Sequence, residues 1–136
     1  MKINSHLTFN GNCREAFEFY EKLLGGSLTM TSFGESPAAN HVPEDWKNRI
    51  VHATLALDES GIAGADIPPD EYRKPEGFYL LIEPEDPNKA EILFSALSTD
   101  GEVKIPLQEM FWSVCYGSLI DKFGTPWEIS CAEAPN

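Results

Sequence analysis

The chain has few cysteines, few basic residues and no long apolar run. Its three cysteines, Cys13, Cys115 and Cys131, are an odd number without a C-x-x-C pair, which argues against a disulfide framework and against a zinc knuckle. No segment reaches the ~20 apolar residues of a membrane span, and the first residues carry no secretory signal. We therefore expect a cytoplasmic protein with reduced thiols, in which each cysteine is a small, partly buried hydrophobic residue.

Basic residues are scarce beside acidic ones: 10 Lys and Arg stand against 22 Asp and Glu, which gives a formal net charge of −12. This surplus of negative charge opposes binding to phosphate backbones and to anionic membrane surfaces. We expect neither nucleic acid nor a membrane as a partner. The 136 residues, 42% of them hydrophobic, suffice for one compact domain or for two half-sized modules that share a core.

Several signatures of catalysis are also missing. The chain has no G-x-S-x-G motif, no phosphate-binding loop, and no G-x-G-x-x-G after a predicted strand. Hydrolase, NTPase and dinucleotide-enzyme functions therefore have no support. A methyltransferase function is disfavoured in the same way, because no glycine-rich cofactor turn is present.

Two segments have helical apolar spacing, and their patterns match. The first runs from Asn12, a possible N-cap, to Leu24 and ends at Gly25-Gly26, and the second runs from about Asp86 to Ser98. The matching positions are Ala16, Phe19, Tyr20 and Leu23 in the first segment and Ala90, Leu93, Phe94 and Leu97 in the second.

The strands around these helices repeat as well, so the order βαβββ occurs twice. We expect strands at 3–9, 27–33, 49–57 and 62–67, and again at 77–82, 103–107, 111–119 and 125–131. The prediction is a single domain of residues 1–136, with module 1 at about 1–68, a polar, proline-rich linker at about 68–76, and module 2 at about 77–136. The long loop 34–48 could form one helical turn at 43–46.

The helix of each module must cover one face of a sheet, which leaves the other face concave once two modules curl together. Because side chains alternate along a strand, the strands can be divided between the two faces. Leu7, Phe9, Leu55, Trp127 and Ile129 are expected on the helix-covered face. The opposite face would carry His6, His52, Thr54, Glu128 and Ser130. We predict an α+β fold of curled mixed sheets with a concave cup.

Two motifs connect this pattern to a known family. The first helix reads Gly11-Asn12-Cys13-Arg14-Glu15-Ala16-Phe17-Glu18-Phe19-Tyr20, and the final turn reads Asp121-Lys122-Phe123-Gly124-Thr125-Pro126-Trp127. With Trp112 and Tyr116-Gly117, they resemble the vicinal oxygen chelate (VOC) superfamily, in particular its PhnB-like branch, over essentially the whole chain. The resemblance implies the glyoxalase/bleomycin resistance/dioxygenase fold, a homodimer, a cup-shaped site and, in metal-using members, a divalent ion chelated by substrate oxygens.

The metal site that the resemblance implies is matched at one position only. Glu128 corresponds to the carboxylate of the last strand, but two further ligand positions hold Ala65 and Phe78, and the first-strand position falls near residues 4–5, beside His6. An ion of the zinc or nickel type needs three or four ligands that converge at about 2.0–2.2 Å. We therefore expect the family's metal site to be incomplete.

Three functions stay open. The first is a small-molecule binding protein without a cofactor, whose ligand-binding residues are His6, His52, Thr54, Trp112, Tyr116 and Glu128. The second is a divalent-metal-dependent lyase, isomerase or dioxygenase in which His6, His52 and Glu128 hold the ion or act as catalytic acids and bases. The third is a non-catalytic interaction domain. His41, in the long loop, is expected to be solvated.

Overall fold

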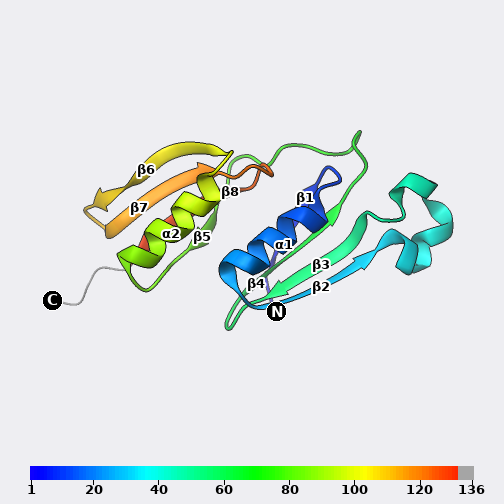
Figure 1. The fold of residues 1–136 in the computed structure, drawn as a ribbon, viewed down its shortest axis with the longest axis horizontal. Helices are drawn as coiled ribbons and strands as arrows, with labels where there is room; N and C mark the ends of the chain where they lie inside the picture. The colour runs from blue at the N-terminus through cyan, green and yellow to red at the C-terminus, as the bar shows by residue number, and fades with distance from the viewer. Residues whose placement is uncertain (132–136) are drawn as a thin grey trace. The chain divides into compact units, whose positions relative to one another are not determined.

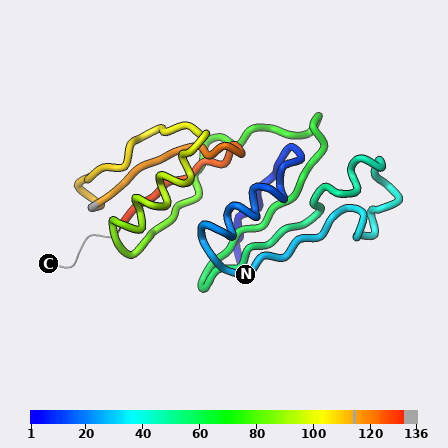
Figure 2. The backbone as a smooth tube through the Cα atoms, viewed as in Figure 1, coloured from blue at the N-terminus to red at the C-terminus, as the bar shows by residue number. Residues whose placement is uncertain are grey.

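The computed structural model describes residues 1–131, except for the side chain of Val114. Two compact units divide the chain between Arg73 and Lys74, within the segment predicted as a linker. Figures 1 and 2 follow each unit from its first strand through its helix to its last strand. Residues 132–136 of the predicted second module lie outside the described residues.

The first unit is a four-stranded sheet with one helix against it. Its elements are β1 (Ser5–Phe9), α1 (Cys13–Leu24), β2 (Ser27–Ser32), β3 (Ile50–Ala56) and β4 (Gly61–Asp66). The strand order is β1-β4-β3-β2, with β1 parallel to β4 and the other pairs antiparallel. A parallel pair needs a long crossover connection, which the rest of the unit supplies between β1 and β4.

The second unit repeats this arrangement. Its elements are β5 (Leu80–Ile82), α2 (Pro87–Ser98), β6 (Glu102–Met110), β7 (Ser113–Ile120) and β8 (Pro126–Cys131), in the strand order β5-β8-β7-β6. Only β5 and β8 are parallel within this sheet. Strand β6 lies at the sheet edge, and its register against β7 shifts at three points. The predicted α+β fold with two βαβββ units is confirmed, although β5 is shorter and β6 longer than expected.

Helix α1 rests closely on its sheet. The ring of Phe17 meets that of Phe9 edge to face, with centroids 5.9 Å apart. Gly64 of β4 lies beneath Phe17, and a Cβ atom there would come within 2.7 Å of the ring carbon Cε2. Glycine is therefore needed at this position for the close approach of helix and sheet. The buried residues of α1 are Cys13, Ala16, Phe17 and Tyr20.

Asn12 is the N-cap residue of α1 as predicted, but the first turn is capped by a side chain from outside the helix. Asn12 occupies the N-cap position, but its side chain makes no capping hydrogen bond. Instead, the Cys13 N–H donates to Oδ1 of Asp66 (3.0 Å), and the Ile50 N–H donates to Oδ2 (2.9 Å). The buried carboxylate of Asp66 thus ties together α1, β3 and β4 at the positive end of the helix. In α2, Asp86 caps the helix itself by accepting the Lys89 N–H.

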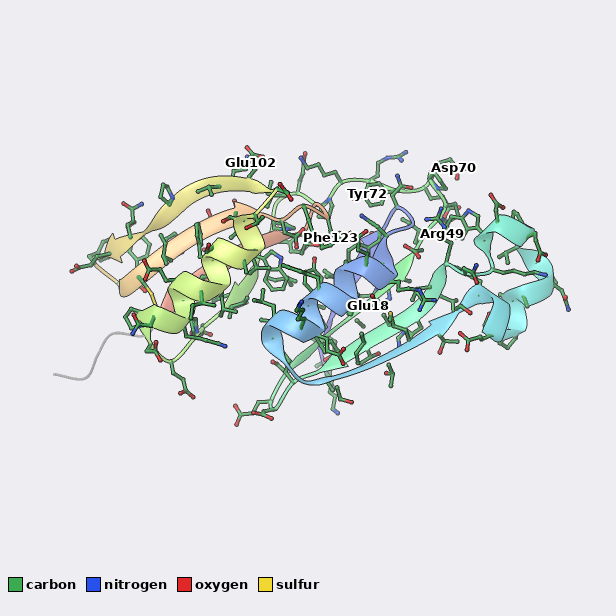
Figure 3. The ribbon with its side chains drawn as sticks, in the orientation of Figure 1. Glu18, Arg49, Asp70, Tyr72, Glu102 and Phe123 are labelled. Atoms are coloured by element: carbon green, nitrogen blue, oxygen red, sulfur yellow. A yellow bond between two sulfur atoms is a disulfide. The ribbon has the colours of Figure 1, made fainter. Side chains whose placement is uncertain are left out.

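The motif from Asp121 to Trp127 is a turn held by one buried carboxylate. Oδ1 of Asp121 accepts the N–H groups of Phe123 (2.9 Å) and Thr125 (3.0 Å), and Oδ2 accepts the indole N–H of Trp127 (2.8 Å). Gly124 has a φ of 91°, which glycine adopts without strain. Figure 3 labels Phe123 in this turn. The motif fixes where β8 begins and how Trp127 is oriented.

The loop between β2 and β3 contains three short 3-10 helices: Phe33–Glu35, Pro37–His41 and Glu44–Trp46. The last one confirms the turn predicted at 43–46. The Trp46 ring lies 5.5 Å from the Phe33 ring, and the guanidinium of Arg49, labelled in Figure 3, lies 5.6 Å from the Trp46 ring. His41 is exposed, as predicted. These ring contacts give the loop a small aromatic cluster of its own.

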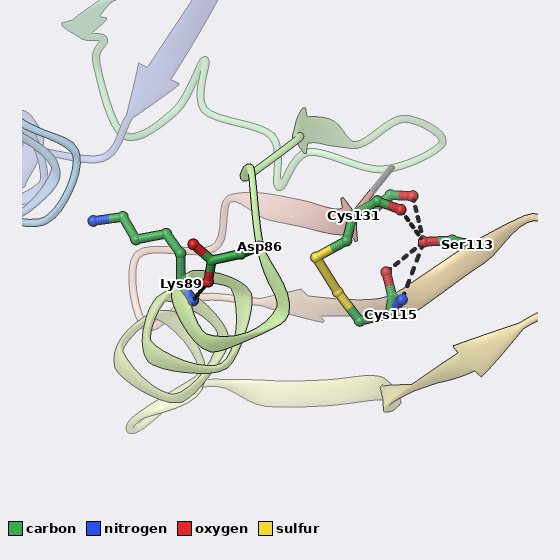
Figure 4. Close-up of a disulfide and its surroundings, with 6 residues drawn as sticks. Asp86, Lys89, Ser113, Cys115 and Cys131 are labelled. Atoms are coloured by element: carbon green, nitrogen blue, oxygen red, sulfur yellow. Dashed lines mark hydrogen bonds between the residues drawn. A yellow bond between two sulfur atoms is a disulfide. The ribbon is translucent and has the colours of Figure 1, made fainter. Parts of the chain in front are cut away.

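Cys115 and Cys131 form a disulfide between β7 and β8, so the prediction of reduced cysteines is wrong for this pair. The two residues are register partners with Cα atoms 5.3 Å apart, a separation that a disulfide can bridge. The Ser113 hydroxyl lies 2.6 Å from the carbonyl oxygen of each cysteine (Figure 4). The third cysteine, Cys13, is free and buried, and burial raises the pKa of its thiol to about 12.

Thiol counting should distinguish the three cysteines. In protein purified without reductant, we expect iodoacetamide to modify one thiol, that of Cys13, in the unfolded chain and three after reduction. The native protein should not react, because Cys13 is buried and its raised pKa keeps the thiol protonated at neutral pH. Mass spectrometry of the alkylated chain measures the count. Three reactive thiols in the unfolded, unreduced chain would contradict the disulfide.

Candidate functional site

In the first unit, the predicted polar residues share the face of the sheet that α1 does not cover. His6 of β1 and Thr54 of β3 are register partners of the same residue, Ala63 of β4. His52 lies one pleat along β3 from Thr54, and its Nε2 is hydrogen-bonded to the Thr54 Oγ1 at 2.9 Å. The intervening Ala53 is buried. Within this unit, the three residues therefore lie on the face of the sheet to which the sequence analysis assigned them.

A groove of about 680 Å³ borders this face of the first sheet. Its walls come from residues 2–5 and from the β3–β4 hairpin at 54–63, together with His52. The volume is typical of pockets that bind small molecules. The groove includes His52 and Thr54, whereas His6 is not among its lining residues.

In the second unit, Glu128 and Tyr116 share the face of the sheet opposite α2. Glu128 of β8 is the register partner of Ser118, and Tyr116 of β7 is the partner of Ser130. Tyr116 and Glu128 are therefore diagonal neighbours, and the Tyr116 hydroxyl donates a hydrogen bond to Oε2 of Glu128. Both side chains are partly exposed. The alternate residues of β8, Trp127 and Ile129, are buried instead.

Aromatic side chains extend this face beyond Tyr116. Trp112, in the two-residue turn between β6 and β7, meets the Tyr116 ring with centroids 5.5 Å apart and planes at 67°. Phe111 follows, with its ring 4.5 Å from that of Trp112 and planes at 86°. Trp112 is 47% exposed. The second unit therefore presents a carboxylate beside a row of accessible aromatic rings.

Sequence reasoning missed one further residue on this face. Ser118 is 1% exposed, and its hydroxyl has no hydrogen-bond partner within residues 1–131. A buried hydroxyl without a partner is unusual, because protein interiors satisfy nearly all such groups. Ser118 is the register partner of Glu128 between β7 and β8, so its unpartnered hydroxyl lies on the same face of the sheet as Glu128. The sequence pattern predicts that Ser118 lies in a strand, but it does not show that the hydroxyl lacks a hydrogen-bond partner.

The contact with Glu128 changes the acidity of Tyr116. The hydrogen bond to Glu128, followed by partial burial and the negative charge of that carboxylate, raises the pKa of Tyr116 from 10.0 to about 12. The folded chain thus holds the phenol proton more tightly than the unfolded chain. The resulting contribution to stability is complete below pH 10 and is lost as the pH rises from 10 to about 12.

An alkaline titration tests this contact. The ultraviolet phenolate signal of Tyr116, obtained as the difference between the wild type and Tyr116→Phe, should titrate near pH 12. In Glu128→Gln it should titrate closer to pH 10, because the anionic acceptor is gone. Glu91→Gln, on the exposed side of α2, is the matched control and should leave the titration unchanged. Equal titration in the wild type and Glu128→Gln would refute the assignment.

The residues present do not fit the metal site that the resemblance implies. Within the described part of the chain, no three His, Cys, Asp or Glu side chains are grouped to hold a metal ion. Ala65 and Phe78 offer no donor atoms in their side chains, and the matched Glu128 is hydrogen-bonded to Tyr116. His6 and His52 belong to the first unit, whereas Glu128 belongs to the second. The set of His6, His52 and Glu128 as ligands of an ion stays a prediction.

Comparison with known proteins gives consistent matches along the chain. The model of a family described as 3-demethylubiquinone-9 3-methyltransferase matches residues 1–130. Protein YjdN of Escherichia coli (strain K12) is 31% identical over 139 residues, which cover 96% of this chain and 95% of that protein. The crystal structure of protein PA1353 from Pseudomonas aeruginosa superposes with a TM-score of 0.90 and 38% identity, over 98% of this chain and 99% of that chain.

A more distant structure shares the fold alone. A glyoxalase/bleomycin resistance protein/dioxygenase from Nocardioides matches with a TM-score of 0.57 and 16% identity, over 100% of this chain and 87% of that chain. No helix within residues 1–131 has the length and apolar character needed to cross a bilayer.

Proposed function

We propose that this chain, which belongs to the family described as 3-demethylubiquinone-9 3-methyltransferase, the PhnB-like branch of the VOC superfamily, binds a small molecule. The proposed site is the face of the second sheet that α2 does not cover. The observation that carries this proposal is the hydrogen bond from Tyr116 to Glu128. In metal-using members of the superfamily, the position of Glu128 supplies a ligand to the ion. Here Tyr116 orients the carboxylate, which can then contact a ligand directly.

The surroundings of Glu128 support binding. Along one row of the sheet, Leu81, Glu128, Ser118 and Ile105 lie side by side on the four strands. The two outer residues are apolar and accessible, at 54% exposure for Leu81 and 36% for Ile105, and the two inner residues are polar. Sites for small molecules typically combine apolar surface with a few placed polar groups. A single row of this sheet supplies both.

Methyl transfer has less support than binding, although the family description names it. The adjacent glycines Gly25 and Gly26 follow the end of α1 with positive φ angles and therefore close a helix. A glycine-rich loop that holds a nucleotide-like cofactor would instead open a helix after a strand. The proposal is accordingly a binding function, with an incomplete metal site and no nucleotide-type cofactor.

The proposal includes a cytoplasmic homodimer, as expected for this branch. Phe78 and Val103 of the second unit are large, exposed hydrophobic residues of the kind that subunit contacts cover. Light scattering at micromolar concentration measures the assembly, and a monomer would contradict it. A cytoplasmic location also implies that the Cys115–Cys131 pair meets a reducing environment, in which such disulfides are rare.

A compound screen tests the binding function. A ligand of the native state raises the unfolding temperature, so a library of small metabolites is screened by thermal shift against the wild type, Glu128→Gln and Glu91→Gln. We expect at least one compound class to stabilise the wild type and Glu91→Gln but not Glu128→Gln. If no compound distinguishes the variants, binding at Glu128 is refuted and the interaction-domain function is favoured.

Elemental analysis of the same preparations separates binding from metal-dependent chemistry. We expect little stoichiometric zinc, nickel, iron or manganese in the purified chain. One tight ion per chain, lost in both His52→Ala and Glu128→Gln, would contradict the metal-free proposal. That result would favour a metal-dependent lyase, isomerase or dioxygenase that uses His6, His52 and Glu128.

A further inference from the structure

The geometry points to a small organic cation, a substituted or quaternary ammonium compound, as the ligand of the Tyr116–Glu128 face. This inference rests on the proposed function and specifies the chemical class of its ligand. Three features carry it: a carboxylate without a cationic partner, a row of accessible aromatic rings that begins at its hydrogen-bond partner Tyr116, and exposed apolar side chains in its row of the sheet.

The carboxylate of Glu128 has no cationic partner within the described residues. The salt bridge of the second unit joins Lys104 to Glu102 at 3.3 Å and does not involve Glu128. One oxygen of Glu128, Oε2, accepts the Tyr116 hydroxyl, which leaves Oε1 for a ligand. A neutral hydrogen bond orients a carboxylate but does not neutralise it, so a cation is the ligand that restores charge balance.

The neighbouring rings favour the same charge. Trp112 and Tyr116 meet at 67°, and Phe111 and Trp112 meet at 86°, so adjacent rings form corners rather than one flat stack. A cation placed over the face of an aromatic ring, tryptophan above all, is attracted by the ring's quadrupole. A quaternary ammonium group is weakly hydrated and apolar at its surface, so it suits such corners better than a metal ion does.

Other ligand classes fit this face less well. An anion would be repelled by Glu128 and by the chain's formal net charge of −12. A neutral apolar compound would cover Glu128 and leave its charge unpaired, which is costly. The exposed side chains of Leu81 and Ile105 can contact the alkyl substituents of a cation.

Choline and its neutral carbon isostere, 3,3-dimethylbutan-1-ol, form a matched pair of probes that differ in charge but hardly in shape. By isothermal titration calorimetry on the intact chain, we expect choline to bind at least about tenfold more tightly than the alcohol. Glu128→Gln should weaken choline binding by roughly 10- to 100-fold, because it removes a charged partner and keeps the shape. Trp112→Leu, at an accessible turn, should weaken it by roughly 3- to 30-fold.

Two controls keep the outcome interpretable. Glu91→Gln removes an equal charge from the exposed side of α2 and should bind choline as the wild type does. Circular dichroism verifies that each variant is folded. Equal binding of choline and the alcohol, absence of choline binding, or unchanged binding in Glu128→Gln would each overturn the inference. If neutral or anionic compounds from the thermal-shift screen depend on Glu128 while choline does not bind, the cation is refuted and the proposed binding function stands.

Discussion

Asp121→Asn is expected to lower the free energy of unfolding of the second unit by about 3 kcal/mol. The carboxylate accepts three N–H groups at 2.8–3.0 Å in a site that is 3% exposed. An amide keeps one acceptor oxygen and replaces the other by an NH₂ donor. At least one buried donor, the Trp127 indole N–H or a backbone N–H, then faces another donor instead of an acceptor.

Urea unfolding followed by circular dichroism measures the change. Asp100→Asn is the matched control, because Asp100 is exposed, lies in the same unit, and has a positive φ of 60° that asparagine tolerates. The control should shift stability by less than about 0.5 kcal/mol. A similar, small effect of both substitutions would show that the Asp121 carboxylate does not hold the turn.

Asp66→Asn is expected to destabilise the first unit by about 2 kcal/mol. Each oxygen of Asp66 accepts one backbone N–H, from Cys13 at the start of α1 and from Ile50 at the start of β3. The substitution removes one acceptor and also the negative charge that favours the helix N-terminus. The same denaturation experiment measures it, with the exposed Asp70→Asn as the control.

The two substitutions should also change hydrogen exchange in different units of the chain. Asp66→Asn should expose the amides of α1 and β3 to hydrogen exchange, because its partners lie in those elements. Asp121→Asn should instead affect β8 and the turn before it. Uniform loss of protection along the whole chain in both variants would contradict these local roles.

The fold could be predicted because its signals are local. The apolar stripe of α1 recurs with helical spacing, and the last strand alternates between buried Trp127 and Ile129 and the more exposed Glu128 and Ser130. Such periods depend only on neighbouring residues. The repetition of the pattern predicts two similar units without any information on contacts between strands.

The tertiary hydrogen bonds and the disulfide could not be predicted in this way. Asn12 occupies the N-cap position as predicted, but the hydrogen bond that caps α1 comes from Asp66, 53 positions further along the chain than Cys13. Cys115 and Cys131 are separated by 16 positions and become partners only through the register of β7 and β8. Register depends on long-range packing, which a single strand does not specify.

The candidate site was predictable in its residues but not in its contacts. Alternation predicted that Glu128 shares a face with Ser130, and Tyr116 was predicted as a ligand-binding residue without being assigned to a face. The hydrogen bond between Tyr116 and Glu128 arises because their strands pair Tyr116 with Ser130, one pleat away. His52 and Thr54 point to the same side of β3 because they are two residues apart in the strand. This shared side allows the hydrogen bond between their side chains.

The irregular outer strand β6 has a consequence for association between copies of the chain. An edge strand offers unpaired backbone groups to which a strand of another molecule can bind, which is a common route to aggregation. Strand β6 carries Pro106, which lacks an N–H, and the charged Lys104, and its register shifts break the regular spacing of the ladder. Intermolecular extension of the second sheet is therefore obstructed at this border.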